Sequence, residues 1–270
     1  SLGYTDQEGM VQKNTYNRKN ARLNLDQKIN KYISMSANIS YSNGFSKAPN
    51  TGASFATAGA ARLAFVLAPN LGPYALDGSG KYNILGSAIG NMGQPVPNYG
   101  YYNPVAIFDL NKFTTESDRL LATLSATIEP FKGLSFKTVY GLDNVSIEDN
   151  LFQTGLTGDS FAANGLALNQ FNRPNRWTWT NTLNYNVTLA ERFNLGVLGG
   201  IEEQFTIGKS WIGQKTNVND VFFTEYHGSW TTAGMGTGGF YENYFLSYFG
   251  RLNFNYDKKY YLEFSALRDC

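Results

Sequence analysis

Apolar and polar residues alternate with a period of two along much of the chain. Between residues 33 and 43 the apolar side chains of Ile33, Met35, Ala37, Ile39 and Tyr41 alternate with serine and asparagine. Such alternation predicts a β-strand with one apolar and one polar face. Eleven residues at about 3.3 Å each span roughly 36 Å, enough for a tilted crossing of an apolar band about 25 Å thick.

The same pattern recurs in pairs of segments that are joined by short turns. One of these turns is Pro130-Phe131-Lys132-Gly133, and another contains Asp257-Lys258-Lys259. The pattern therefore predicts eight strands in four hairpins. The paired segments are about 17–28 with 33–43, 120–129 with 134–143, 177–189 with 195–201, and 246–256 with 260–266.

The predicted links between hairpins are much longer than the turns within them, at about 44–117, 148–175 and 209–240. Short turns at one end of a sheet and long loops at the other are typical of a transmembrane barrel. Soluble sandwiches usually keep their loops short at both ends. Within the first link, residues 53–67 are rich in alanine and predict a short helix that ends before Pro69.

Composition supports strands that contact something less polar than water. Aromatic residues make up 15% of the chain and charged residues only 16%, with 28 glycines. The net charge of +1 gives no reason to expect a nucleic-acid partner. Aromatic residues lie near the ends of the apolar rows, where a membrane meets water. They are Tyr41, Trp177, Trp179, Tyr256 and Tyr260.

The sequence does not predict an enzyme. His227 is the sole histidine, and Cys270 is the sole cysteine, so no catalytic residue, disulfide framework, metal site or cofactor is expected. Glu202 and Glu203 are adjacent in a predicted strand and should point to opposite faces. Glu203 would fall on the apolar row, which indicates that the apolar band ends there. No apolar run is long enough for a transmembrane helix, and no export signal is visible.

Aromatic residues of the long links are the candidate ligand-binding residues. Tyr99, Tyr101 and Tyr102 cluster in the first link, and Trp211, Tyr226 and Trp230 lie in the third. These rings could stack against sugars or peptides, or they could form the core of the loops themselves. The glycine run at 234–239 lacks the strand and helix that a phosphate-binding loop needs, so we interpret it as a loop tip.

Several short motifs lie in order along nearly the whole chain. They are Tyr16-Asn17-Arg18 with 21–26, Ser40-Tyr41-Ser42, Asp77-Gly78-Ser79-Gly80, Asn103-Pro104-Val105-Ala106, 131–137 with Gly141, and 247–262. In their order and spacing these motifs resemble the SusC/RagA family of TonB-dependent outer-membrane transporters. The family usually continues the final Arg268-Asp269 with Gly-Ser-Ser, whereas this chain has Cys270.

The resemblance implies an all-β fold, an antiparallel transmembrane barrel of about 22 strands with short periplasmic turns and long extracellular loops. Residues 1–270 would be a partial barrel domain, without the plug domain and the remaining strands. The implied function is active import of oligosaccharides or peptides across the bacterial outer membrane. The implied partners are a SusD-like surface lipoprotein, the TonB complex acting through parts outside this chain, and the membrane's own lipid and lipopolysaccharide.

Two other interpretations stay open at the level of sequence. A complete eight-stranded barrel could serve as a membrane anchor or adhesin with a packed interior. A soluble β-sandwich could bind glycans through its loop aromatics. Further strands and a plug upstream in the parent gene would exclude the small barrel, whereas solubility without detergent would favour the sandwich.

Overall fold

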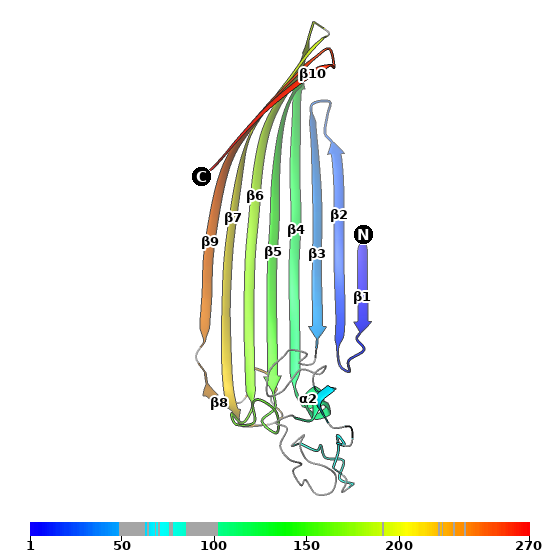
Figure 1. The fold of residues 1–270 in the computed structure, drawn as a ribbon, viewed down its shortest axis with the longest axis vertical. Coiled ribbons are helices and arrows are strands. Elements are labelled where there is room, and N and C mark those ends of the chain that lie inside the picture. Colours follow the sequence, from blue (N-terminus) through cyan, green and yellow to red (C-terminus); the bar gives the residue numbers. More distant parts are fainter. Residues whose placement is uncertain are drawn as a thin grey trace.

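The computed structural model describes residues 1–48, 63, 65–67, 69, 71–75, 78–84, 102–190, 192–220, 222, 224–228, 230–234 and 236–270. These residues form one ten-stranded antiparallel sheet and a short helix (Figure 1). The elements are β1 (Leu2–Glu8), β2 (Thr15–Lys28), β3 (Ile33–Lys47), α2 (Pro104–Leu110), β4 (Lys112–Phe131), β5 (Leu134–Gln153), β6 (Leu166–Leu189), β7 (Phe193–Val218), β8 (Trp230–Ala233), β9 (Thr237–Tyr256) and β10 (Tyr260–Asp269).

Each long strand pairs with the next long strand along the chain. The order is β1-β2-β3-β4-β5-β6-β7-β9-β10, and the short β8 pairs with β7. The turns of the hairpins β2–β3, β4–β5, β6–β7 and β9–β10 lie together at the top of Figure 1, and the links between hairpins lie at the bottom. We call these the hairpin end and the loop end. The sheet is open, with β1 and β10 at its two edges.

The four predicted hairpins are confirmed, but the predicted bounds of the links are wrong. The links run 48–111, 154–165 and 219–236, and the last contains β8. The strands extend further because backbone pairing continues where both faces are polar. Glu148 pairs with Phe171 and Asn150 with Asn169 in such a stretch. Alternation marks only the part of a strand with one apolar face, so it missed these extensions, and it also missed β1 and β8.

The predicted helix at 53–67 lies mostly outside the described residues, although Leu63, Phe65 and Val66 have helical backbone. Helix α2 was not predicted. Asn103 caps it, because its side chain accepts hydrogen bonds from the N–H groups of Val105 and Ala106. Neither helical stretch in the described part of the chain has the length and apolar character needed to cross a membrane.

Strand register places every predicted apolar row on the same face of the sheet, which we call the apolar face. One row that crosses seven strands is Leu23–Ile39–Ala122–Leu142–Trp177–Phe205–Tyr244. The row one position away lies on the opposite, polar face and is Arg22–Ser40–Leu121–Asp143–Arg176–Thr206–Asn243. A slip of one residue at any strand would exchange the faces, so the rows fix the register.

The apolar face is not packed into a protein core in the described structure. Leu23 is 56% exposed, Leu124 48% and Leu183 51%, although all three lie several residues inside the ends of their strands. The buried apolar residues of the described part lie instead in the links or near the loop end of the sheet. They are Leu63, Ala106, Ile107, Phe152 and Ala167.

Aromatic side chains border the apolar face at both ends. Toward the loop end, the ring of Trp177 lies 6.2 Å from that of Tyr140 and 6.0 Å from that of Phe205. At the hairpin end, the ring of Phe193 lies 4.7 Å from that of Tyr256. Residues 193 and 205 are twelve positions apart on β7, about 40 Å along the strand. A tilt of about 35–45° reduces this to roughly 28–33 Å, close to the thickness of a bilayer core.

Candidate functional site: the polar face of the sheet

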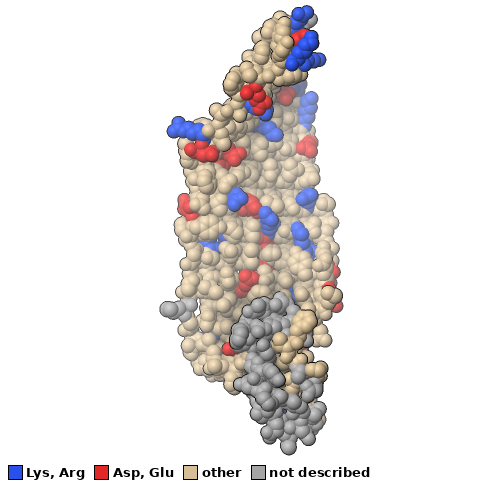
Figure 2. Space-filling view, in the orientation of Figure 1, with Lys and Arg blue, Asp and Glu red and all other residues tan. Residues whose placement is uncertain are grey.

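Short polar side chains on the polar face bind one another across neighbouring strands. The hydroxyls of Ser36 and Ser125 are 2.7 Å apart, and the hydroxyl of Thr180 donates to Glu202 Oε2 at 2.9 Å. These groups satisfy part of their hydrogen bonding locally, and their hydroxyl groups keep this part of the surface polar. Figure 2 shows charged side chains of both signs over the middle of the strands as well as at the ends. Such a surface is suited to water or a polar solute.

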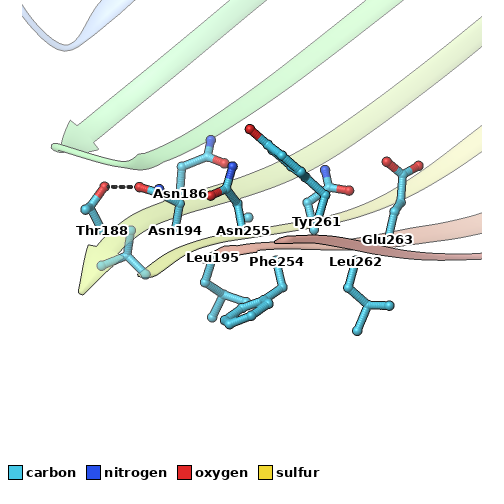
Figure 3. Close-up of a pocket in the computed structure, with 12 residues that line it drawn as sticks. Asn186, Thr188, Asn194, Leu195, Phe254, Asn255, Tyr261, Leu262 and Glu263 are labelled. Carbon is cyan, nitrogen blue, oxygen red and sulfur yellow. Dashed lines mark hydrogen bonds between the residues drawn. The ribbon is translucent and has the colours of Figure 1, made fainter. Parts of the chain in front are cut away.

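A shallow hollow of about 460 Å³ lies on the sheet near the hairpin end. In Figure 3 the polar side chains extend to one side of the strands, while Leu195, Phe254 and Leu262 extend to the other. Gly196 leaves room there, because a Cβ at this position would lie 2.8 Å from Asn186 Oδ1. Amide groups dominate the hollow, so it can donate and accept hydrogen bonds. Its polar lining is Asn186, Thr188, Asn194, Asn253, Asn255, Tyr261 and Glu263.

The two adjacent glutamates lie on opposite faces, as the alternation predicts. Glu202 is on the polar face with Thr180, and Glu203 is on the apolar face, where Tyr244 Oη donates to it at 3.2 Å. The expectation that the apolar row ends at Glu203 is wrong, since Phe205 and Ile207 continue it. The separation of the two carboxylates rules out their use as an acid–base pair.

Trp211 and Tyr226, two of the predicted ligand-binding residues, come together on the loop-end extension of the apolar face. The ring of Tyr226 lies 6.5 Å from that of Trp211 and over Gly213, and Lys215 Nζ is 4.7 Å from the Tyr226 ring. The link that carries Tyr226 and Trp230 therefore folds onto the outside of the strand ends. This packing accounts for the rings without a ligand, and the proposed ligand contacts stay a prediction.

Trp230 packs the link 219–236 against the sheet. Its indole Nε1 donates to the carbonyl oxygen of Glu225 at 2.9 Å, and its ring meets the ring of Phe152 edge-on at 6.1 Å. Glu225 is itself ion-paired with Lys112 at 2.6 Å. Tyr99 and Tyr101 lie outside the described residues. Tyr102 is partly exposed beside the helix cap, and no described contact joins it to the three rings.

An ion pair ties α2 to the turn between β1 and β2. Asp109 is ion-paired with Lys13 and accepts a hydrogen bond from Tyr82 Oη at 2.8 Å. The hydrogen bond from Lys13, and then that from Tyr82, hold the pKa of Asp109 below its ordinary range. The hydrogen bond between Tyr82 and Asp109 also raises the pKa of Tyr82. Sequence reasoning missed this contact because the three residues are far apart in the chain.

A second set missed by sequence reasoning is the charged array on the polar face. Arg119 binds Asp143 through two hydrogen bonds of 2.9 and 2.8 Å, and Arg176 lies directly across from Asp143 on β6. Charged residues at polar-row positions of successive strands were the available signal. Within the described residues, no group of three or more histidine, cysteine, aspartate or glutamate side chains could hold a metal ion.

No family model matches the chain. The chain is similar to TonB-dependent receptor P3 of Formosa agariphila, with 27% identity over 277 residues. That alignment covers 100% of this chain and 26% of the relative. The chain therefore spans about a quarter of the curated relative that it matches.

Solved structures of the RagAB peptide transporter share the fold of this chain. One such chain gives a TM-score of 0.78 at 22% identity, over 99% of this chain and 29% of that chain. The RagAB peptide importer in its "open-open" state gives 0.80 at 22% identity, over the same shares. Identity at this level shows the fold, which is the segment of barrel wall that the strand pattern predicts. The chain is therefore similar in sequence to a TonB-dependent receptor, and it shares the fold of one part of the RagAB transporter chains.

Proposed function

We propose that this chain is part of the wall of an outer-membrane transporter that imports large nutrients. The observation that carries the proposal is the sorting of side chains between the two faces. All apolar rows share one exposed face bordered by aromatic rings, and the hydroxyl and amide rows share the other. Lipid on the apolar face and water on the polar face satisfy both sets of side chains at once.

The open edges of the sheet support a place within a larger barrel. Within the described residues β1 and β10 each pair on one side only. Unpaired strand edges are unfavourable in a membrane, because backbone groups there find no water. Further strands of the parent protein would pair with both edges and close a barrel wide enough for an oligomeric solute.

We infer the cargo and partners from the family resemblance. The cargo would be an oligosaccharide or peptide, and a SusD-like surface lipoprotein would cover the loop end. The TonB complex would supply energy through a plug that blocks the lumen. The links 48–111, 154–165 and 219–236 all lie at the end where the lipoprotein would sit. Lipid and lipopolysaccharide would contact the apolar face.

Spin labels on one strand test the orientation of the faces. Single cysteines would replace Leu120, Leu124, Thr123 and Ser125 of β4 in the full-length parent protein, reconstituted in lipid after Cys270 is changed to serine. We expect labels at 120 and 124 to collide more with oxygen, which partitions into lipid. Labels at 123 and 125 should collide more with a water-soluble nickel chelate. Equal behaviour at all four sites would contradict the proposal.

Uptake by cells tests the transport activity itself. Deletion of the parent gene should abolish growth on its nutrient, and loss of TonB should do the same.

The competing soluble sandwich is not supported, because the described strands form one sheet and not two packed sheets. The complete eight-stranded barrel is not supported either, since ten strands pair without β1 meeting β10.

A further inference from the structure

Positive charge gathers on the loop half of the polar face. We take the polar row Arg22–Ser40–Leu121–Asp143–Arg176–Thr206 as a boundary and consider that row and everything toward the loop end. The basic side chains on this part of the described polar face are all arginine, and we call them the arginine cluster. Its members are Arg18, Arg22, Arg119 and Arg176.

Two carboxylates lie on the same surface, and both already have partners. Asp143 is bound by Arg119 through two hydrogen bonds, and Asp149 accepts a hydrogen bond from Thr115 Oγ1 at 2.6 Å. Glu202 lies on the hairpin side of the boundary, about 13 Å along the strand from the level of Arg176. With four arginines and two carboxylates, the loop half of the polar face therefore has an excess of two positive charges.

Three of the four guanidinium groups have no carboxylate partner among the described residues. Arg176 Nε donates to Thr206 Oγ1 at 3.3 Å, which leaves its other donors available. Arg18 and Arg22 are exposed, and their side chains form no ion pair with described residues. Arg176 also lies opposite a carboxylate that Arg119 has already engaged. Arg176 thus adds a positive charge that Asp143 does not neutralise.

The spacing of the cluster suits an extended ligand. Arg22 is on β2 and Arg176 is on β6, four strand spacings away, or about 19 Å. An aromatic ring lies nearby on the same face. Tyr241 covers Gly208, since a Cβ on that glycine would lie 2.0 Å from the ring. Gly208 is two positions from Thr206, so this ring borders the Arg176 end of the cluster.

We propose that the arginine cluster binds carboxylate groups of an anionic oligomer on its way through the lumen. Guanidinium groups present paired donors that match a carboxylate, and they bind it while losing less hydration than an ammonium would. A positive surface at the entrance side also raises the local concentration of anions before binding. This inference rests on the proposed function and narrows its cargo to oligomers that carry carboxylates.

The test compares charged and neutral ligands on the purified full-length protein. One arm uses an oligogalacturonate and its methyl ester, and the other uses a glutamate-rich hexapeptide and its glutamine counterpart. We expect the carboxylated member to bind about tenfold more tightly in at least one arm, with an affinity that falls as salt rises. The arm that responds identifies the source of the carboxylate. Equal affinity of both members in both arms would overturn the proposal.

Variants locate the effect on the surface. The double substitution Arg22→Gln and Arg176→Gln should remove most of the preference and weaken its salt dependence. The matched control is Lys137→Gln with Arg251→Gln, two cations on the hairpin half of the polar face, and it should keep the preference. Equal losses in both doubles would indicate general electrostatics and would overturn the assignment to the cluster. Circular dichroism checks that both variants are folded.

Failure of this inference is distinguishable from failure of the proposed function. If TonB-dependent uptake of a neutral oligomer persists without any preference for carboxylates, the transporter assignment stands and the arginine cluster has another role. If cells that carry the parent gene take up no oligomer at all, the transporter assignment itself fails.

Discussion

Arg119 on β4 donates two parallel hydrogen bonds to the carboxylate of Asp143 on β5, at 2.9 Å from Nε and 2.8 Å from Nη2. This geometry is the strongest that a side-chain ion pair adopts. The two side chains are nevertheless 50% and 31% exposed, so solvent screens much of the attraction. The pair therefore fixes the positions of two side chains on the polar face more than it stabilises the fold. It also neutralises the charge of Arg119, and so it lowers the positive charge that the arginine cluster presents to a ligand.

Replacing Asp143 with asparagine should therefore change stability little and charge noticeably. We expect the free energy of unfolding to fall by about 1 kcal/mol or less, because exposed pairs contribute about that much. Urea titration of the refolded full-length protein, followed by tryptophan fluorescence, measures this. The same variant should bind a carboxylated oligomer more tightly, since Arg119 is released. A loss of stability above about 3 kcal/mol, the range of a buried pair, would contradict the exposed geometry.

Gly133 is the position where the hairpin between β4 and β5 tolerates no side chain. Its φ is +95°, and a Cβ there would lie 2.2 Å from the carbonyl oxygen of Asn186. Both the backbone conformation and the contact exclude alanine, so Gly133→Ala should destabilise the protein by about 3 kcal/mol. Gly199→Ala is the control, since a Cβ there meets nothing within 4 Å. Equal urea midpoints for the two variants would show that the turn can rearrange.

The faces of the sheet were readable from sequence, whereas the extent of the strands was not. Ile39, Ala122 and Leu142 fall on one row because the period of two puts the apolar side chains of every strand on one face, and a slip of one residue would move them to the other. Outside the apolar band that constraint disappears. Asn150 and Asn169 pair in the backbone, yet both are polar, and nothing in their types marks a strand.

Contacts between distant segments were also beyond the reach of sequence reasoning. Trp211, Tyr226 and Trp230 were identified as aromatic residues of one link, but Trp211 is in β7 and only the other two are in the link. Their shared position on the outside of the strand ends follows from how that link folds back. Lys13 and Asp109 meet for a similar reason, since strand pairing carries their two segments to the same end of the sheet.

The ion pair between Lys13 and Asp109 should make the loop end sensitive to acid. The pKa of Asp109 is lowered from its ordinary value of 3.8 by its two hydrogen-bond donors. A lowered pKa means that the contact stabilises the folded state fully above about pH 4 and is lost as the pH falls through the lower, folded value. Hydrogen exchange of residues 9–14 and 104–110, corrected for intrinsic rates, should accelerate in that range.

Asp109→Asn is the matched variant for the acid prediction. It keeps the size of the side chain and removes the titration, so exchange in these segments should be faster at neutral pH and should no longer depend on pH near 3. Asp257→Asn is a control at the opposite end of the sheet, where Lys259 is the ion-pair partner. An unchanged acid response in Asp109→Asn would assign the sensitivity to another carboxylate.

Leu124 and Thr123 are neighbours on β4 that face opposite sides of the sheet, and they give the sharpest test of what those sides contact. Leu124 is 48% exposed in the middle of the apolar face. If that face meets lipid, Leu124→Arg places a charge near the bilayer midplane and should destabilise the protein by about 2–4 kcal/mol. Thr123→Arg places the same charge in an aqueous lumen and should change stability by less than about 0.5 kcal/mol. Both variants would be compared by urea titration in lipid vesicles and by the amount of protein that reaches the outer membrane. In water, an exposed leucine on a strand would accept arginine as readily as an exposed threonine does. Equal tolerance at the two positions would therefore mean that water covers both faces, and the membrane assignment would fail with it.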